Sequence, residues 1–328
     1  MRLRWASLLI GGLLVAAGCS DSRTPTQPGN PDFALQQSNH HIMLPRGLAP
    51  ALTNEAKPGG GGHGGGGTGI FYHGGPVLVT TNVAAIYWAG STIYTGGPAP
   101  GSRGTGAQDG SLVGYFLRSL GGSGYFNINS TYFNGSGTHV QNSVTYTQFW
   151  AANNNVPAPG ASVSDAAVQA EVISGFSSGN LTFDSNTLYE VFSGPGVNLG
   201  GGFGSSYCAY HGHFSWNGND VKYSVMPHDY DFPSACAALS GSPNNDFAAD
   251  AEVNTLAHET EETTTDEDLN AWYDRRGNEN ADKCAWTFGT TYTTSNGAVA
   301  NENIGGKDWL IQRKWVNAGS GGCLQTYP

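Results

Sequence analysis

Charge is scarce in this sequence, because only 12% of the 328 residues are Asp, Glu, Lys or Arg. The acids outnumber the bases by 25 to 14, which gives a formal net charge of −11 and argues against nucleic acid as a partner. The chain also lacks a phosphate-binding Walker loop and a dinucleotide-binding fingerprint that is followed by a plausible ribose-binding acid. These absences disfavour nucleotide-dependent enzymes. Ser193-Gly194-Pro195-Gly196 and Gly204-Ser205-Ser206 do not form the G-x-S-x-G element of serine hydrolases.

Cysteine is also rare, with five residues that never form a C-x-x-C pair. The spacing therefore disfavours a zinc–thiolate site. Apart from Cys19, the chain has an even set: Cys208, Cys236, Cys284 and Cys323. Four cysteines in an exported domain indicate two disulfides, for which three pairings exist. We expect the sequential pairing, Cys208 with Cys236 and Cys284 with Cys323.

The only long apolar run at the N-terminus, Leu8 to Val15, is too short to span a bilayer. It follows two arginines and precedes small residues and Cys19, a pattern that resembles the bacterial lipobox. We expect residues 1–18 to be a signal peptide and Cys19 to be lipidated, although an ordinary signal peptide with an incidental cysteine is the alternative. The chain would then be exported and lipid-anchored to a membrane of the cell envelope, the outer one if the cell has two.

Glycine is abundant, with 49 residues, and it accompanies proline in the segment after Cys19. Residues 19–68 contain several prolines and end in a glycine-rich run. Polar sequence of this composition buries no core and is typical of a flexible linker. We therefore expect a tether at 19–68 and a single folded domain at 69–328.

The folded part has the pattern of an α+β domain. Helices are expected after Asp109, at Ser164 or Asp165, and after Asp246, where a capping side chain precedes helical spacing. Strand-like segments lie at 76–88, 125–133, 140–150, 187–192, 207–214 and 221–226. The last two flank Asn217-Gly218-Asn219-Asp220, which is a hairpin signal. The order of these elements predicts a mixed or mainly antiparallel sheet.

The third helix carries the pattern His258-Glu259-Thr260-Glu261-Glu262. It is a variant of the zinc-peptidase helix H-E-x-x-H, with Glu262 at the place of the second histidine. Positions i and i+4 share a helix face, so His258 and Glu262 are candidate ligands of one metal ion. Glu259 is then the candidate base for a metal-bound water. An acidic run of this kind fits an exposed polar face equally well, and the spacing leaves both interpretations open.

A third metal ligand is needed, because catalytic zinc sites usually have three protein ligands and a water. Glu279 and Asp282 are candidates, since the chain has room to return to the helix after a turn. Asp266 and Asp268 are alternatives if the helix breaks at 263–265. One histidine with two carboxylates is a harder donor set than a histidine-rich zinc site, so Mn²⁺ and Ca²⁺ are alternatives to Zn²⁺.

Six short segments follow one another in a recognisable order: Tyr72-His73-Gly74-Gly75-Pro76, Tyr207-Cys208-Ala209-Tyr210-His211, His258-Glu259-x-x-Glu262, Asn270-Ala271-Trp272-Tyr273, Glu279-x-Ala281-Asp282-x-Cys284 and Trp309-Leu310-Ile311-Gln312. Together they resemble the phosphate-induced protein / EXORDIUM family over about 72 to 323, which is essentially the whole folded part. Two departures from the family pattern are Tyr210 in place of tryptophan and the absence of a proline after the motif helix.

The resemblance implies an exported, disulfide-bonded domain with a helix similar to that of zincin metallopeptidases, and it implies no demonstrated reaction. Asp282 and Glu279 rank ahead of the other acids as third ligand, because both fall in the family-like segment before Cys284. Asp282 is the first choice and Glu279 the second. His211, His213 and Tyr210 are alternative candidates for stabilising an oxyanion or the substrate. Because His211 and His213 share one side of a strand, a pair of metal ligands and a polar strand face are alternatives for them.

Two functions compete on this sequence. The first is a metal-dependent hydrolase, zincin-like in fold, that acts on peptides through a metal-bound water and Glu259. The second is a non-enzymatic surface module that binds cell-wall polysaccharide through aromatic side chains: Trp150, Trp216, Trp272 and Tyr273. The peptidase requires a bound metal and Glu259, whereas the binding module requires neither.

Overall fold

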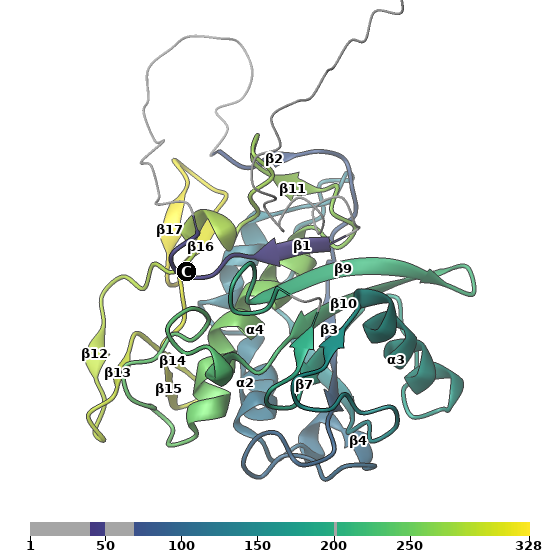
Figure 1. Cartoon of the computed structure of the whole chain (residues 1–328). Coiled ribbons are helices and arrows are strands. Elements are labelled where there is room, and N and C mark those ends of the chain that lie inside the picture. Colours follow the sequence, from purple (N-terminus) through teal and green to yellow (C-terminus); the bar gives the residue numbers. More distant parts are fainter. Residues whose placement is uncertain (1–39, 50–68, 200–201) are drawn as a thin grey trace, which may run out of the picture. The chain divides into compact units, whose positions relative to one another are not determined.

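A seven-stranded mixed sheet organises the protein (Figure 1). The computed structural model describes residues 40–49, 69–199 and 202–328, all within the compact unit Pro31–Pro328. The strand order is β1 (His40–Met43), β9 (Ala209–Trp216), β10 (Asn219–Met226), β7 (Thr187–Ser193), β3 (Thr81–Trp88), β5 (Val144–Trp150) and β4 (Arg103–Thr105). The inner pairs β10–β7, β7–β3 and β3–β5 are parallel, and the others are antiparallel. The prediction of a mixed α and β fold with a mainly sheet core is confirmed.

Helices cover both faces of this sheet. Side chains alternate along a strand, so Val83 and Ala85 of β3 pack in one apolar cluster with α2 (Leu112–Leu120) and α4 (Phe247–Thr265). Ala84 and Ile86 pack in a second cluster on the opposite face, with α3 (Asp165–Ser177). Strands buried on both faces need apolar side chains at every position, which is why β3 has a nearly continuous apolar sequence.

All three predicted helices are present, and each begins at a capping side chain. Ser164 caps α3 and Asp246 caps α4, by accepting from the backbone N–H of the third residue that follows. α2 differs from the prediction in its cap, because Ser111 accepts from the Gly114 N–H. Asp109 is instead buried and accepts hydrogen bonds from the hydroxyls of two core tyrosines.

The predicted hairpin is β9 and β10. Asn217 and Gly218 join the strands with φ angles of 50° and 78°, the left-handed conformations that a two-residue turn of this kind requires. The hairpin fixes the register in which His211 of β9 pairs with Ser224 of β10.

One predicted strand is wrong. Residues 125–133 contain the 3₁₀ helix η2 (Phe126–Thr131) instead. The apolar side chains at Tyr125, Phe126 and Ile128 are all buried, but they follow one another too closely to distinguish a strand from a tight helix. Within the predicted strand segment 76–88, only Thr81–Trp88 forms a strand.

The predicted tether also needs a correction, because β1 lies inside it. His40–Met43 pairs with β9, and Ile42 and Met43 are buried. Residues 19–68 are rich in proline and glycine overall, but they contain a short apolar run that adds a strand to the sheet edge. The predicted signal peptide, Cys19 and the tether residues 20–39 and 50–68 lie outside the described residues.

After α4 the chain is built from short elements and contains one disulfide. The cysteines pair in the expected way, Cys208 with Cys236 and Cys284 with Cys323. The minor elements are β2 (Phe71–Tyr72), η1 (Gly106–Gln108), β6 (Ser162–Val163), β8 (Asn198–Leu199), η3 (Asp229–Asp231), β11 (Trp272–Tyr273), η4 (Asp282–Cys284), β12 (Tyr292–Thr293), β13 (Val299–Ala300), β14 (Glu302–Ile304), β15 (Lys307–Trp309), β16 (Lys314–Val316) and β17 (Gly322–Leu324). In the described ranges, none of the helices has the length and apolar character that crossing a membrane requires.

Candidate metal centre

The motif helix α4 is buried despite its polar sequence. Every residue from Ala249 to Thr265 is buried, including the whole acidic run from His258 to Glu262. Hydroxyl groups in this part of the helix, such as those of Thr260 and Thr263, donate to the backbone carbonyl four residues earlier. These hydroxyls therefore have hydrogen-bond partners inside the core. The alternative of an exposed acidic face is therefore excluded.

Glu262 lies at the centre of three histidines that come from three different elements. Its Oε2 atom is 3.1 Å from Nε2 of His258 on the same helix. The same oxygen is 3.9 Å from Nε2 of His41 on β1 and 3.9 Å from Nδ1 of His211 on β9. Sequence positions 41, 211 and 258 are thus brought to one carboxylate oxygen.

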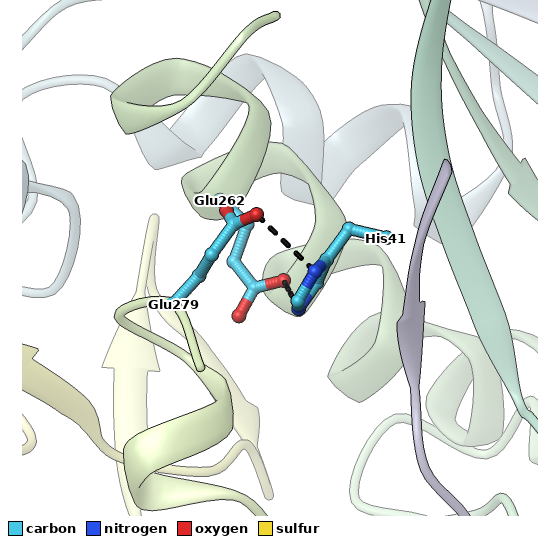
Figure 2. Close-up of side chains that lie close together, drawn as sticks. All are labelled: His41, Glu262 and Glu279. Carbon is cyan, nitrogen blue, oxygen red and sulfur yellow. Dashed lines mark ion pairs between the residues drawn. The ribbon is translucent and has the colours of Figure 1, made fainter. Parts of the chain in front are cut away.

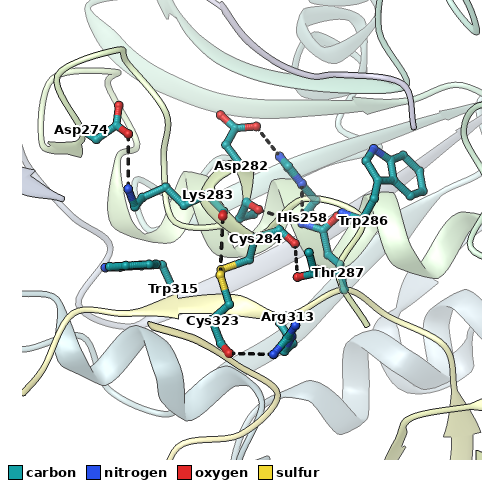
Figure 3. The surroundings of a disulfide bond; sticks show 12 residues. His258, Asp274, Asp282, Lys283, Cys284, Trp286, Thr287, Arg313, Trp315 and Cys323 are labelled. Atoms are coloured by element: carbon teal, nitrogen blue, oxygen red, sulfur yellow. Dashed lines mark hydrogen bonds and ion pairs between the residues drawn. A yellow bond between two sulfur atoms is a disulfide. The ribbon is translucent and has the colours of Figure 1, made fainter. Parts of the chain in front are cut away.

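The other oxygen of Glu262 fixes the carboxylate in place. Oε1 accepts hydrogen bonds from the backbone N–H groups of Ala281 and Asp282, at 3.1 and 2.9 Å. These residues begin η4, which the Cys284–Cys323 disulfide ties to the C-terminal strands (Figure 3). Only Oε2 of Glu262 is therefore directed at the histidines.

Asp282, the first-ranked third ligand, joins this group. Its Oδ1 atom is 3.5 Å from Nε2 of His258, and Figure 3 shows the two side chains directed at each other. Its Oδ2 atom is 2.5 Å from Nε2 of His41. Ligand atoms of His258, Glu262 and Asp282 all lie within 4.8 Å of one another.

Glu279, the second-ranked candidate, lies on the other side of His41. One carboxylate oxygen is 3.4 Å from Nδ1 of His41 (Figure 2). The other oxygen is 3.7 Å from Nε2 of His211. Glu279 forms a possible ligand group with His41 and Glu262, not with His258. We therefore treat it as a partner of His41 and His211.

Glu259 contacts His211 directly. Nδ1 of His211 lies 2.9 Å from Oε2 of Glu259, and both side chains are fully buried. Burial lowers the pKa of His211 to about 3, so its ring is neutral and Nδ1–H donates to the carboxylate. Burial raises the pKa of Glu259 to about 7, which places the carboxylate in the range of an effective general base.

The pKa values of the other two histidines move the opposite way. Burial would lower the pKa of His41, but the nearby carboxylates, Asp282 most of all, together outweigh it and raise the pKa to about 10. For His258, burial is outweighed mainly by Glu262, and the pKa rises to about 9. The pKa of Asp282 is held well below its usual range, because burial is outweighed by these two histidines. The cluster strongly favours positive charge at its centre.

Several atoms of the cluster are buried but not hydrogen-bonded. Nε2 of His258, Oε2 of Glu262, Nε2 of His211 and Oε2 of Glu279 have no hydrogen-bond partner in residues 40–49, 69–199 and 202–328. Nε2 of His258 and Oε2 of Glu262 are only 3.1 Å apart, yet their directions do not suit a hydrogen bond. Zinc bonds of 2.0–2.2 Å in a tetrahedron place ligand atoms about 3.3–3.6 Å apart. The residues therefore fit a divalent cation that they would surround.

Gln312 contacts the opposite side of the His258 ring. Its amide nitrogen donates to the carbonyl of Ala281 and lies 3.0 Å from Nδ1 of His258, while its oxygen accepts from the N–H of Trp286. A cation at Nε2 requires the amide to turn, so that its oxygen accepts from Nδ1–H, the second contact that metal-binding histidines usually make.

The other sequence candidates lie outside the cluster. Asp266 ends α4 and accepts from two backbone N–H groups of the next turn. His213 forms a separate group with Asp220 and Asp268, and Lys222 makes an ion pair with Asp220 there at 3.1 Å. His211 and His213 therefore do not act as a pair, although they share one strand.

Sequence reasoning missed His41, because it lies in the segment expected to be a tether. A signal was present in the doublet His40-His41 followed by the apolar residues Ile42-Met43-Leu44. It also missed Lys314 of β16, which is fully buried and interacts electrostatically with the carboxylates of α4, most strongly with Glu261.

Comparison with known proteins adds no further constraint. No protein-family model, curated protein or solved structure matches the chain. The case for a function therefore rests on the residues of this cluster and their geometry.

Proposed function

We propose that the protein is a metal-dependent hydrolase with a zincin-like centre, built from His258, Glu262 and Asp282. The observation that carries the proposal is the convergence of their ligand atoms in a buried cluster whose central atoms are left without hydrogen bonds by the described chain. One histidine and two carboxylates bind Zn²⁺, Mn²⁺ or Ca²⁺. Membership of the EXORDIUM family belongs to the same proposal.

A divalent cation at this place would polarise a substrate carbonyl and lower the pKa of a nearby water. The protein would supply the proton transfers. The free Oε1 atom of Glu259 accepts a proton from the attacking water, while His211 holds the other oxygen through Nδ1–H. The water oxygen bonds to the carbonyl carbon, the C–N bond breaks, and Glu259 delivers the proton to the departing amine. The products are one carboxylic acid and one amine.

We favour a peptide substrate over a polysaccharide. Trp150 and Trp272 are buried in the core, at 3% and 4% exposure, and Trp216 packs on Phe176. Tyr273 stacks against His73 at 3.6 Å. The aromatic residues that would support sugar binding are thus engaged in packing. Through the lipobox-like sequence before Cys19, the proposal places this activity at the cell envelope.

Elemental analysis of the purified full chain is the test. We expect about one Zn²⁺ or Mn²⁺ per chain, and loss of that metal in a His258→Ala variant. His139→Ala is the matched control, because His139 is an exposed histidine whose ring bonds to a backbone carbonyl away from the cluster. A wild-type chain that stays free of metal after incubation with Zn²⁺, Mn²⁺ and Ca²⁺ would overturn the proposal.

A further inference from the structure

The strand that carries His41 is an edge strand next to the candidate centre. β1 has only four residues and pairs antiparallel with β9, so that His41 stands opposite His211. This register directs the His41 side chain at the carboxylates of Glu262 and Asp282. Figure 2 shows His41 leaving β1 toward Glu262 and Glu279.

The centre is closed to any substrate larger than water. The side chains of His211, His258, Glu259 and Glu262 are fully buried. A cavity of about 40 Å³ reaches the cluster at His41 and Asp282, and β1 and the loop 276–278 supply much of its remaining wall. A cavity of this size has room for water but is much too small for a peptide.

Backbone atoms of this segment make several of the contacts that hold β1 and the residues after it, beside side-chain contacts such as those of His40 with Tyr223 and Asp165. The Cys208 N–H donates to the Met43 carbonyl, and the Arg46 N–H donates to the Ala235 carbonyl. The indole N–H of Trp286 donates to the Leu44 carbonyl. Backbone bonds of this kind are independent of sequence, so another extended chain is able to make them.

A catalytic metal site keeps one position open for water or substrate. His258, Glu262 and Asp282 supply three ligand atoms, and Nε2 of His41 lies 3.9 Å from Oε2 of Glu262 and 2.5 Å from Oδ2 of Asp282. Nε2 of His41 thus lies beside two of the three residues that would hold the cation.

We propose that β1 occupies the substrate position of the protein's own hydrolase centre. The substrate is an extended polypeptide that displaces β1 and pairs antiparallel with β9, with the residue opposite His211 placed over Glu259 and Glu262. This inference rests on the proposed function, and it adds a substrate class and a self-inhibiting contact. The chain is active only when the segment 40–49 has left the β9 edge.

Ile42→Pro tests the proposal in the full chain, because proline breaks strand pairing. Arg103→Pro, in the edge strand β4 at the opposite end of the sheet, is the matched control. The probe is fluorescently labelled casein, an unfolded polypeptide. We expect Ile42→Pro to hydrolyse it at least tenfold faster than the wild type and to release its metal to a chelator at least tenfold faster. Equal rates in a folded, metal-loaded Ile42→Pro chain would overturn the proposal.

A second measurement does not depend on the folding of that variant. In a Glu259→Gln chain, which binds but does not cleave, casein should increase hydrogen exchange of residues 40–49 while the β10 amides stay protected. Unchanged exchange with casein bound would also overturn the inference.

The two proposals fail in different ways. If no variant binds metal, the hydrolase proposal fails, and the strand contact is still tested by acylation of histidines with diethylpyrocarbonate. His211 and His258 should then be modified in Ile42→Pro and protected in the wild type. Protection in both chains would overturn displacement of β1 by itself.

Discussion

His41 and His211 are direct neighbours across β1 and β9, with ring centroids 5.6 Å apart, although they are 170 positions apart in the sequence. Both rings contact the carboxylates of Glu262 and Glu279. They differ in burial and in the sign of their pKa shifts, because Asp282 contacts His41 most closely. His211 belongs to β9, which has a neighbouring strand on each side, whereas His41 belongs to the edge strand β1.

The edge position of His41 predicts different effects for two histidine variants. His41→Ala should retain the metal with an affinity lowered by no more than about tenfold, whereas His258→Ala should lower it by more than about 100-fold, beyond the range for outer contacts. The reason is that His258 supplies a ligand next to two carboxylates, while His41 occupies the position of the substrate. Isothermal titration with Zn²⁺ measures both affinities, and equal losses would contradict this difference.

Glu259→Gln should keep the metal and lose the reaction. The amide has nearly the same shape and still accepts from His211, but it takes no proton from water. We expect hydrolysis of casein by the Ile42→Pro chain to fall by about 10²–10⁴-fold when Glu259→Gln is added. Metal content serves as the internal control, since a variant that also loses its metal would assign Glu259 to the ligands.

Gln312→Leu should lower metal affinity by about 10–100-fold, because it removes the contact to Nδ1 of His258 that fixes the ring. Gln325→Leu is the control: Gln325 bonds to the carbonyl of Ile311 and touches no residue of the candidate site. Competition with a fluorescent zinc chelator gives both affinities. If Gln312→Leu binds as tightly as the wild type, Gln312 does not orient the ring.

The Cys284–Cys323 disulfide should matter for the site as well as for stability. Replacing both cysteines by alanine removes a cross-link across 39 positions and should cost about 2–5 kcal/mol of unfolding free energy. Asp282 should lose its position, and metal affinity should fall with it. The Cys208→Ala, Cys236→Ala pair should lower the unfolding free energy similarly, with a smaller effect on affinity. Urea unfolding and zinc titration distinguish the two outcomes.

Glu171 of α3 gives a pH prediction away from the site. Burial raises its pKa to about 7, outweighing a hydrogen bond from Asn154, whereas the unfolded value is near 4.5. The folded chain therefore binds this proton more tightly, and the wild type loses stability as the pH rises from about 4.5 to about 7. Glu171→Gln should be more stable at pH 8, by on the order of 1 kcal/mol because solvent screens part of the charge.

Thermal unfolding at pH 4 and pH 8 checks this difference. At pH 4 the carboxyl group is protonated in both states, so the advantage of the glutamine variant should vanish. An advantage of the same size at both pH values would show that the charge of Glu171 is not its cause.

Local sequence was sufficient for many elements. The caps at Ser164 and Asp246, the turn at Asn217-Gly218 and the apolar run of β3 act over a few residues, and each predicted its element. The same locality explains the failure at 125–133, where closely spaced apolar residues suit both a strand and a 3₁₀ helix.

The motif His258-Glu259-Thr260-Glu261-Glu262 and the even cysteine count were readable from the sequence, because helix spacing and cross-linking depend on residue type and position. The burial of that acidic run, the selection of Asp282 at the centre and the arrival of His41 from the supposed tether were decided by tertiary structure alone. The sheet order, the β1–β9 pairing and the η4 backbone donors join residues far apart in sequence, and no local pattern encodes such contacts.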